Sequence, residues 1–234
     1  MQSGGKTMSV VVLASLTVEF RALRPYHTAM VPSRIERLAG RAIQVVIVCI
    51  FFVGLYTRNL SVAVNAVLAL AATFLPAVLR RDWEIRLHPL LGLWLALAVL
   101  LHAIGMLGPY HYIDWWDHVT HTLSATVVAA VGYVTARAVD EYTETVYLPD
   151  RFMFVYILLF TLAAGVFWEV LEFGARLAAD AVGSEAVLVQ YGLGDTIVDL
   201  VFDTVGAVLV ALFGTPPLAD TIDSVTERLE RTRP

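Results

Sequence analysis

Residues 114–121, with the sequence DWWDHVTH, place two carboxylates and two imidazoles at the start of an otherwise apolar segment. In a helix, Asp114 and His118 are four residues apart, as are Asp117 and His121, so the four side chains lie on neighbouring rows of one face. Packing in an apolar environment does not require these residue types, because burying a charged group without a partner is costly. The spacing therefore indicates a polar site.

Acidic residues recur in two later apolar segments. Glu169 and Glu172 are three residues apart and share one face of a helix. Asp195, Asp199 and Asp203 recur at every fourth position of the next segment, and Asp203 lies about 12 Å along the helix axis from Asp195. Three consecutive segments are thus expected to deliver seven carboxylates and two imidazoles to one leaflet of a membrane.

Such a cluster needs partners, because an intramembrane carboxylate costs roughly 2.5 to 3.5 kcal/mol, and the chain offers almost no Lys or Arg nearby. A bound cation, or protonation of several acids, relieves this cost. The single cysteine, Cys49, excludes a cysteine-built metal cluster. The ligand types suit a divalent Zn, Fe, Mn, Mg or Ca ion alike. Glu169 is the candidate catalytic residue, and the candidate metal ligands are Asp117, His118, His121, Glu172, Asp195, Asp199 and Asp203.

Many of the same residues also have purely structural interpretations. Isolated histidines are more often hydrogen-bonded than metal-ligating, and this interpretation is preferred for His27, His88, His102 and His111. Trp115, Trp116 and Trp168 suit an aromatic belt at the outer membrane interface, and Asp114 and Asp195 suit helix N-caps. A functional site is preferred over a hydrogen-bond network for Asp117, His121, Glu169, Asp199 and Asp203.

The composition is that of an integral membrane protein. Of 234 residues, 58% are apolar and 16% charged, with a mean hydropathy of +0.71, whereas soluble domains carry roughly a quarter charged residues. We expect an all-α helical bundle of six transmembrane spans, at 39–56, 60–79, 90–107, 115–135, 152–173 and 196–213.

Two flanking regions complete the expected organisation. The apolar run at 10–18 is too short to cross about 30 Å of hydrocarbon, so residues 1–38 are expected to form an interfacial or cytosolic arm before the six-helix domain at 39–215. Ile222, Val225 and Leu229 are spaced three and four apart among charges, which predicts an amphipathic cytosolic helix in the tail at 216–234.

Lys and Arg are distributed unequally between the two sides of the expected spans. Fourteen lie on the side of both termini, and two, Arg58 and Arg176, lie on the other. The positive-inside rule places both termini in the cytoplasm and the polar cluster in the outer leaflet. We expect a multi-pass protein of a prokaryotic plasma membrane, with membrane lipids as partners and no nucleic acid. The residue pattern assigns no oligomeric state.

Three motifs occur in order on three adjacent spans: residues 117–121, then Trp168-Glu169 with Glu172, then Gln190 with Gly194-Asp195, Asp199 and residues 203–207. Together they resemble the motifs of the YjdF-like family of small polytopic inner-membrane proteins, over about residues 113–208. The family pattern picks out Asp117, His121, Glu169, Glu172, Asp195, Asp199 and Asp203. The chain departs from it at His118, where another basic residue is usual, and at Ser124-Ala125, where glycine is expected. A weaker similarity, to VanZ-like membrane proteins, rests on an Asp/His helix followed by an acidic helix, and neither resemblance supplies an activity.

The leading hypothesis is an outward-facing cation site that supports hydrolysis of a lipid, lipid-linked or envelope substrate. Asp117, His121 and a carboxylate of the last span would hold the metal, which lowers the pKa of bound water, and Glu169 would act as general base. The chain has no Gly-x-Ser-x-Gly, His-Glu-x-x-His or P-loop motif, so other hydrolase and nucleotide-binding classes lack support. Two non-enzymatic alternatives stay open: cation or proton binding for transport or sensing, and a membrane scaffold.

Overall fold

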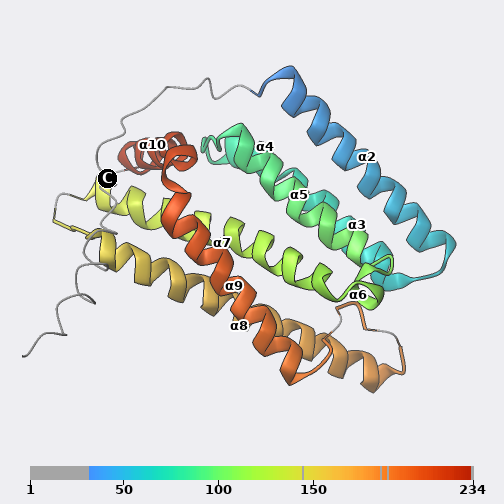
Figure 1. Ribbon diagram of the computed structural model, residues 1–234. Helices are drawn as coiled ribbons and strands as arrows, with labels where there is room; N and C mark the ends of the chain where they lie inside the picture. The colour runs from blue at the N-terminus through green and yellow to red at the C-terminus, as the bar shows by residue number, and fades with distance from the viewer. Residues whose placement is uncertain (1–31, 144, 185, 189, 233–234) are drawn as a thin grey trace, which may run out of the picture.

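A computed structural model describes residues 32–143, 145–184, 186–188 and 190–232 (Figure 1). The helices in chain order are α2 (Arg34–Tyr56), α3 (Leu60–Thr73), α4 (Leu75–Asp82), α5 (Pro89–Gly105), α6 (Pro109–Tyr112), α7 (Asp114–Tyr142), α8 (Asp150–Val182), α9 (Leu193–Phe213) and α10 (Thr215–Arg231). The described ranges contain no β-strand, so the predicted all-α class is confirmed. The expected arm at 1–38 lies mostly outside the described residues, and α2 begins within it.

Four helices, α2, α7, α8 and α9, are long and apolar enough to cross a membrane. The pair α3 and α4 is bent by 41° and adds a fifth span if both parts cross together. The apolar helix α5 has only 17 residues, about 25 Å at 1.5 Å per residue, against roughly 30 Å of hydrocarbon. All six predicted segments are therefore helical, but four or five of them, not six, qualify as candidate spans in the described chain.

Two helices continue well past their predicted ends. α7 extends to Tyr142 and α8 to Val182, whereas the hydropathy pattern ended them at 135 and 173. Hydropathy marks where a segment stops being apolar, while the helix continues through residues such as Ala, Arg and Leu that favour it. α8 stops at Gly183, whose φ of 68° is the left-handed conformation that ends many helices. Glu169 and Glu172 therefore lie inside α8 and not at its end.

The helices pack in two groups. α2, α3 and α5 surround one apolar core, which includes Ile47, Val62 and Ala103. α7, α8, α9 and α10 surround a second, which includes Met153 and Ile157. Packing between α5 and α7 joins the two groups. The polar residues predicted to form a site lie mainly on the helices of the second group.

α7 and α9 make the most extensive contact of any helix pair in the second group. A Cβ atom on Gly206 would lie 2.6 Å from the carbonyl oxygen of Thr122 and 2.7 Å from the Cβ of Ala125, so this position requires glycine. Ala129 and Ala207 are fully buried. Small side chains let two helices in a membrane approach closely, and this contact carries the aspartates of α9 to the face of α7.

The predicted amphipathic tail is α10, and it packs against the bundle. Leu218 and Ile222 are buried, and Val225 and Leu229 lie partly buried against the same core. Arg86 donates its backbone N–H to Ser224 Oγ at 2.8 Å, so α10 also holds the linker between α4 and α5. Figure 1 shows α10 beside α4 at one end of the bundle and α6 at the opposite end. The charge-based topology requires α10 and α6 to lie on opposite sides of the membrane.

Candidate metal centre

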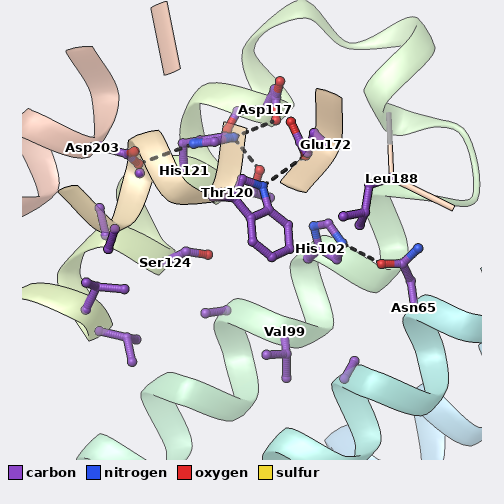
Figure 2. Close-up of a pocket in the computed structure, with 18 of the residues that line it drawn as sticks. Asn65, Val99, His102, Asp117, Thr120, His121, Ser124, Glu172, Leu188 and Asp203 are labelled. Carbon is purple, nitrogen blue, oxygen red and sulfur yellow. Dashed lines mark hydrogen bonds and ion pairs between the residues drawn. The ribbon is translucent and has the colours of Figure 1, made fainter. Parts of the chain in front are cut away.

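His121 lies among three aspartates contributed by α7 and α9. Its Nδ1 is hydrogen-bonded to Oδ1 of Asp203 at 3.2 Å. Its Nε2 lies 3.7 Å from Oδ1 of Asp117 and 3.9 Å from Oδ1 of Asp199, both too long for a hydrogen bond. Figure 2 shows the imidazole between Asp203 on one side and Asp117 on the other.

The bond to Asp203 selects the tautomer of the imidazole. A carboxylate accepts hydrogen bonds, so Nδ1 carries the proton and donates it to Asp203. In the neutral imidazole, the form that binds a metal, the lone pair is then on Nε2, which faces the other two carboxylates. A histidine held in this way by a carboxylate is the usual arrangement of histidine ligands in metal sites.

Asp199 is the most deeply buried member of the cluster, with 2% of the residue exposed. Its Oδ1 accepts no hydrogen bond, which is costly for a buried carboxylate. One ligand atom each from Asp117, His121 and Asp199 lie within 4.8 Å of one another. Ligand atoms on one tetrahedral zinc ion are roughly 3.4 Å apart, given bonds of roughly 2.1 Å. The two distances from Nε2 of His121, 3.7 and 3.9 Å, are a few tenths of an ångström longer than this, and the three atoms, which lie within 4.8 Å of one another, would have to move closer together around an ion.

α8 closes the cluster from a third side. A Cβ on Gly165 would collide with Oδ2 of Asp203, so a larger residue there would displace that carboxylate or α8. Leu200 lies beside the same position. Asp203 is consequently confined between α7 and α8, as its 6% exposure indicates. Asp199 and Asp203 both face the bundle interior, as their spacing predicted.

The two glutamates of α8 face different cavities. Glu172 accepts a hydrogen bond from Trp168 Nε1 at 2.9 Å and lines a cavity with Asp117 and His121. Glu169 accepts hydrogen bonds from Thr196 Oγ1 at 2.6 Å and from Gln190 at 3.3 Å. It borders a second cavity, of about 450 Å³, between α8 and α9. Its Oε1 is buried and accepts no hydrogen bond.

The cavity beside the cluster has a volume of about 440 Å³ and is lined mainly by α3, α5, α7 and α8, with Tyr110 of α6 and Asp203 of α9. Most of its lining is apolar. The polar side chains gather at one end, where Figure 2 shows Asp117, His121 and Glu172 near the same space. Such a cavity is within the size range of small-molecule sites, roughly 300 to 1,000 Å³.

His102 lines this cavity but uses both ring nitrogens in hydrogen bonds. Its Nε2 donates to Oδ1 of Asn65 at 3.1 Å, and its Nδ1 accepts from the Tyr110 hydroxyl at 2.8 Å. Neither nitrogen is left for a metal, so the structural interpretation of His102 is supported. His88 caps α5 and His111 contacts the Tyr191 hydroxyl, whereas His27 lies outside the described residues.

Two tyrosines near the cluster keep their protons. Burial raises the pKa of Tyr110 and of Tyr191, and the nearby Asp117 carboxylate acts in the same direction. Both side chains line the cavity. Their hydroxyls are therefore neutral hydrogen-bond donors at the polar end.

Four proposed ligands lie outside the group of converging ligand atoms: His118, Glu172, Asp195 and Asp203. His118 stacks on Phe202, with ring centroids 4.3 Å apart and planes 8° from parallel. Asp195 accepts a hydrogen bond from the backbone N–H of Tyr191 at 3.0 Å. The N-cap interpretations of Asp114 and Asp195 are wrong, because Ile113 and Gly192 hold the N-cap positions.

Several supporting residues escaped the sequence analysis. Thr196 was not singled out, yet it holds Glu169 by a short hydrogen bond. Gly165 also escaped, although an isolated glycine within a helix is a recognised sign of close packing. Gln190 had been noted as part of a motif, but its partner, Glu169, is evident only from the fold.

Apolar helices around a buried His–Asp cluster define a polytopic helical membrane protein. The chain belongs to the family described as "Predicted membrane protein (DUF2238)", which matches residues 39–218 and so includes the whole cluster. A protein of Thermotoga maritima that carries the name "Uncharacterized protein" is 27% identical over 121 residues. The aligned part is 51% of this chain and spans 58% of the length of that relative. No solved structure matches the chain.

Proposed function

We propose that this membrane protein binds a divalent cation between α7 and α9, through Asp117, His121 and Asp199. The observation that carries the proposal is the convergence of Nε2 of His121 with a buried, unpartnered carboxylate oxygen of Asp199. An ion at this point would satisfy both atoms and neutralise carboxylates that gain no Lys or Arg partner among the ion pairs of the described residues. Asp203 would orient the imidazole from behind.

The ligand set favours a catalytic over a structural role for the ion. Structural zinc sites are closed by four protein ligands, whereas catalytic sites keep a position for water or substrate. Here three ligands converge, and Asp117 and His121 also line the cavity. A water bound in the fourth position would have a lowered pKa and act as a nucleophile near neutral pH. We therefore propose metal-dependent hydrolysis of a lipid or lipid-linked substrate.

The general base proposed from the sequence is Glu169, but the cavity geometry favours Glu172. Glu172 shares the cavity with Asp117 and His121, while Glu169 borders the second cavity. We assign the base to Glu172. Glu169 would instead fix the start of α9 through Thr196.

Two finer proposals concern family and location. Membership of DUF2238 is compatible with the YjdF-like resemblance, which we retain as the finer assignment. The same family supports a membrane location, and the strong bias of Lys and Arg to one side supports the plasma membrane of a prokaryote.

Metal analysis of the detergent-purified protein tests the proposal. After incubation with Zn, Mn or Fe(II) and removal of free ions, the native protein should retain one ion per chain. His121→Ala should lose it, and His118→Ala is the matched control because His118 stacks outside the ligand group. If the native protein retains no ion but takes up protons with changing pH, the proton-binding alternative replaces this proposal. If it does neither, the cluster belongs to a scaffold.

A further inference from the structure

We infer that the 440 Å³ cavity is a chamber for the hydrocarbon chain of a membrane lipid, which reaches it sideways between α3 and α8. The lipid headgroup then lies at the polar end, beside Asp117 and His121. The role of the headgroup as substrate rests on the proposed function. The inference that the cavity holds a hydrocarbon chain is independent of the metal and depends on the shape, the lining and the surroundings of the cavity.

The chamber is long, and its charged side chains lie at one end only. On α7 its lining runs from Asp117 to Val128, and on α8 from Thr161 to Glu172, which is about 16 Å along either helix. This length matches the hydrocarbon of one leaflet, half of roughly 30 Å. Beyond the cluster, the walls are formed by side chains such as Ala72, Leu95 and Val99. An amphiphile with a polar head and a long chain fits this division.

The chamber opens to the side because two of its wall helices do not pack on each other. α3 packs on α2 and α5, and α8 packs on α7 and α9, with no extended packing between α3 and α8 in the described residues. Leu68 of α3 lines the chamber and is also 58% exposed, so it stands at this opening. An opening between apolar helices faces lipid and not water.

Residues 186–188 and 190–191, between α8 and α9, lie at the polar end. Ser61 Oγ and Asn65 Nδ2 both donate hydrogen bonds to the carbonyl oxygen of Val187, at 2.7 and 2.8 Å. Leu188 lines the chamber beneath this bridge. Tyr191 of the same segment contacts His111 beyond α5. These hydrogen bonds hold residues 186–188 against α3 at the polar end, whereas in the part of the chain that the structure describes no such contact joins α3 to α8 at the side.

The surroundings identify the occupant. At this depth a bilayer supplies hydrocarbon chains at high concentration, and an apolar cavity gains contacts when a chain fills it. The neutral hydroxyl of Tyr191 lies at the polar end and suits the ester or phosphate oxygens of a headgroup, whereas the hydroxyl proton of Tyr110 is donated to His102. The two features together favour a glycerolipid or another lipid with an oxygen-rich headgroup.

Photocrosslinking tests the chamber directly. The protein would be reconstituted in phosphatidylethanolamine vesicles that contain a phosphatidylglycerol with a diazirine near the end of one acyl chain. Ser124→Trp places a large ring in the chamber one turn below His121 without changing a ligand. Val131→Trp is the control, since Val131 is exposed on the same helix and does not line the chamber. Ala72→Phe fills the chamber from α3 and serves if Ser124→Trp does not fold.

The native protein and Val131→Trp should give crosslinks to chamber-lining residues of α3, α7 and α8. The filled variant should lose about 90% of them, a roughly tenfold loss that corresponds to about 1.4 kcal/mol of binding. His121→Ala should keep the crosslinks while losing the ion, so failure of the metal proposal is distinguishable from failure of the chamber. Unchanged crosslinking in the filled variants, or crosslinks confined to outward residues such as Phe167, would overturn the inference.

Discussion

At the scale of single residues, the site depends on how Asp203 holds His121. The two ring nitrogens have separate tasks, because Nδ1 is engaged by Asp203 and Nε2 is left to face Asp117 and Asp199. A carboxylate that accepts a hydrogen bond from an imidazole fixes the orientation of the ring and makes the opposite nitrogen a stronger ligand. In the proposed site, Asp203 would thus influence metal affinity without contacting the ion.

Asp203→Asn is predicted to weaken metal binding without abolishing it. The amide oxygen can still accept the hydrogen bond from Nδ1, but it carries no charge and polarises the ring less. We expect a loss of roughly 10- to 100-fold in affinity, the usual effect of changing such a partner. This loss of metal affinity can be measured by competition with a chelator of known affinity.

Asp195→Asn is the matched control, since Asp195 has the same charge on the same helix but lies outside the ligand group. The metal affinity of the Asp195→Asn variant should equal that of the native protein. An equal loss in both variants would indicate a general effect of charge and would remove Asp203 from its assigned role.

At the scale of helices, the site exists because three of them approach unusually closely. Gly206 allows α9 to reach α7, and Gly165 allows α8 to reach Asp203. Side chains at these two positions would separate the helices that carry the ligands. Close helix packing in membranes is driven by such contacts, because lipid and helix surfaces are equally apolar.

Gly165→Ala is predicted to damage the metal site more than the fold. The added methyl group collides with Oδ2 of Asp203, so either the carboxylate or α8 must move. Overpacking of this kind costs typically 1 to 3 kcal/mol, and displacement of Asp203 releases the imidazole. We expect a lower melting temperature together with weaker metal binding.

Gly174→Ala provides the comparison, because Gly174 is on the same helix and a Cβ there meets nothing within 4 Å. Alanine should be neutral or stabilising at that position, since it favours a helix over glycine. If the Gly165→Ala variant bound metal as tightly as the native protein, the position of Asp203 would not determine metal affinity, which contradicts this prediction.

At the scale of the whole molecule, the charges and the fold agree on two opposite ends. Arg86 and α10 meet at one end, where Arg228 also approaches Glu84 at 3.8 Å. α6 and the bridge to Val187 lie at the other end. Arg58 follows α2 directly, at the start of the turn to α3, and so lies toward this second end. With the shorter helix α5 counted as a crossing beside the five candidate spans, the helices alternate in direction, as the unequal distribution of Lys and Arg requires.

We predict that both termini and the Arg80-Arg81 segment are cytoplasmic and that α6 faces outward. The physical reason is the positive-inside rule, applied to fourteen positive residues on one side and two on the other. Fusion reporters at the C-terminus and within residues 108–113 would measure it. If a C-terminal tag were accessible from outside the cell, the orientation would be the opposite of the predicted one, and the candidate metal centre would lie in the inner leaflet.

The sequence by itself determined the class of the protein and most members of the cluster. Apolar runs identify membrane helices because hydropathy is a local property, and a spacing of four residues puts side chains on one helix face in any surroundings. Asp117, His121, Asp199 and Asp203 were predicted to belong together on this basis, and they lie together in the fold. Their assignment as metal ligands stays a prediction.

Only the tertiary structure decided how these side chains are used. Each residue turns a helix by about 100°, so Glu169 and Glu172 point about 60° apart. Because α9 packs against α8, the two side chains lie in separate cavities. Stacking on Phe202 likewise sets His118 apart from His121, three residues away. The spacing of residues in a helix shows which side chains share a face. The residues that pack against that face belong to distant segments of the chain, and the local sequence does not encode those contacts.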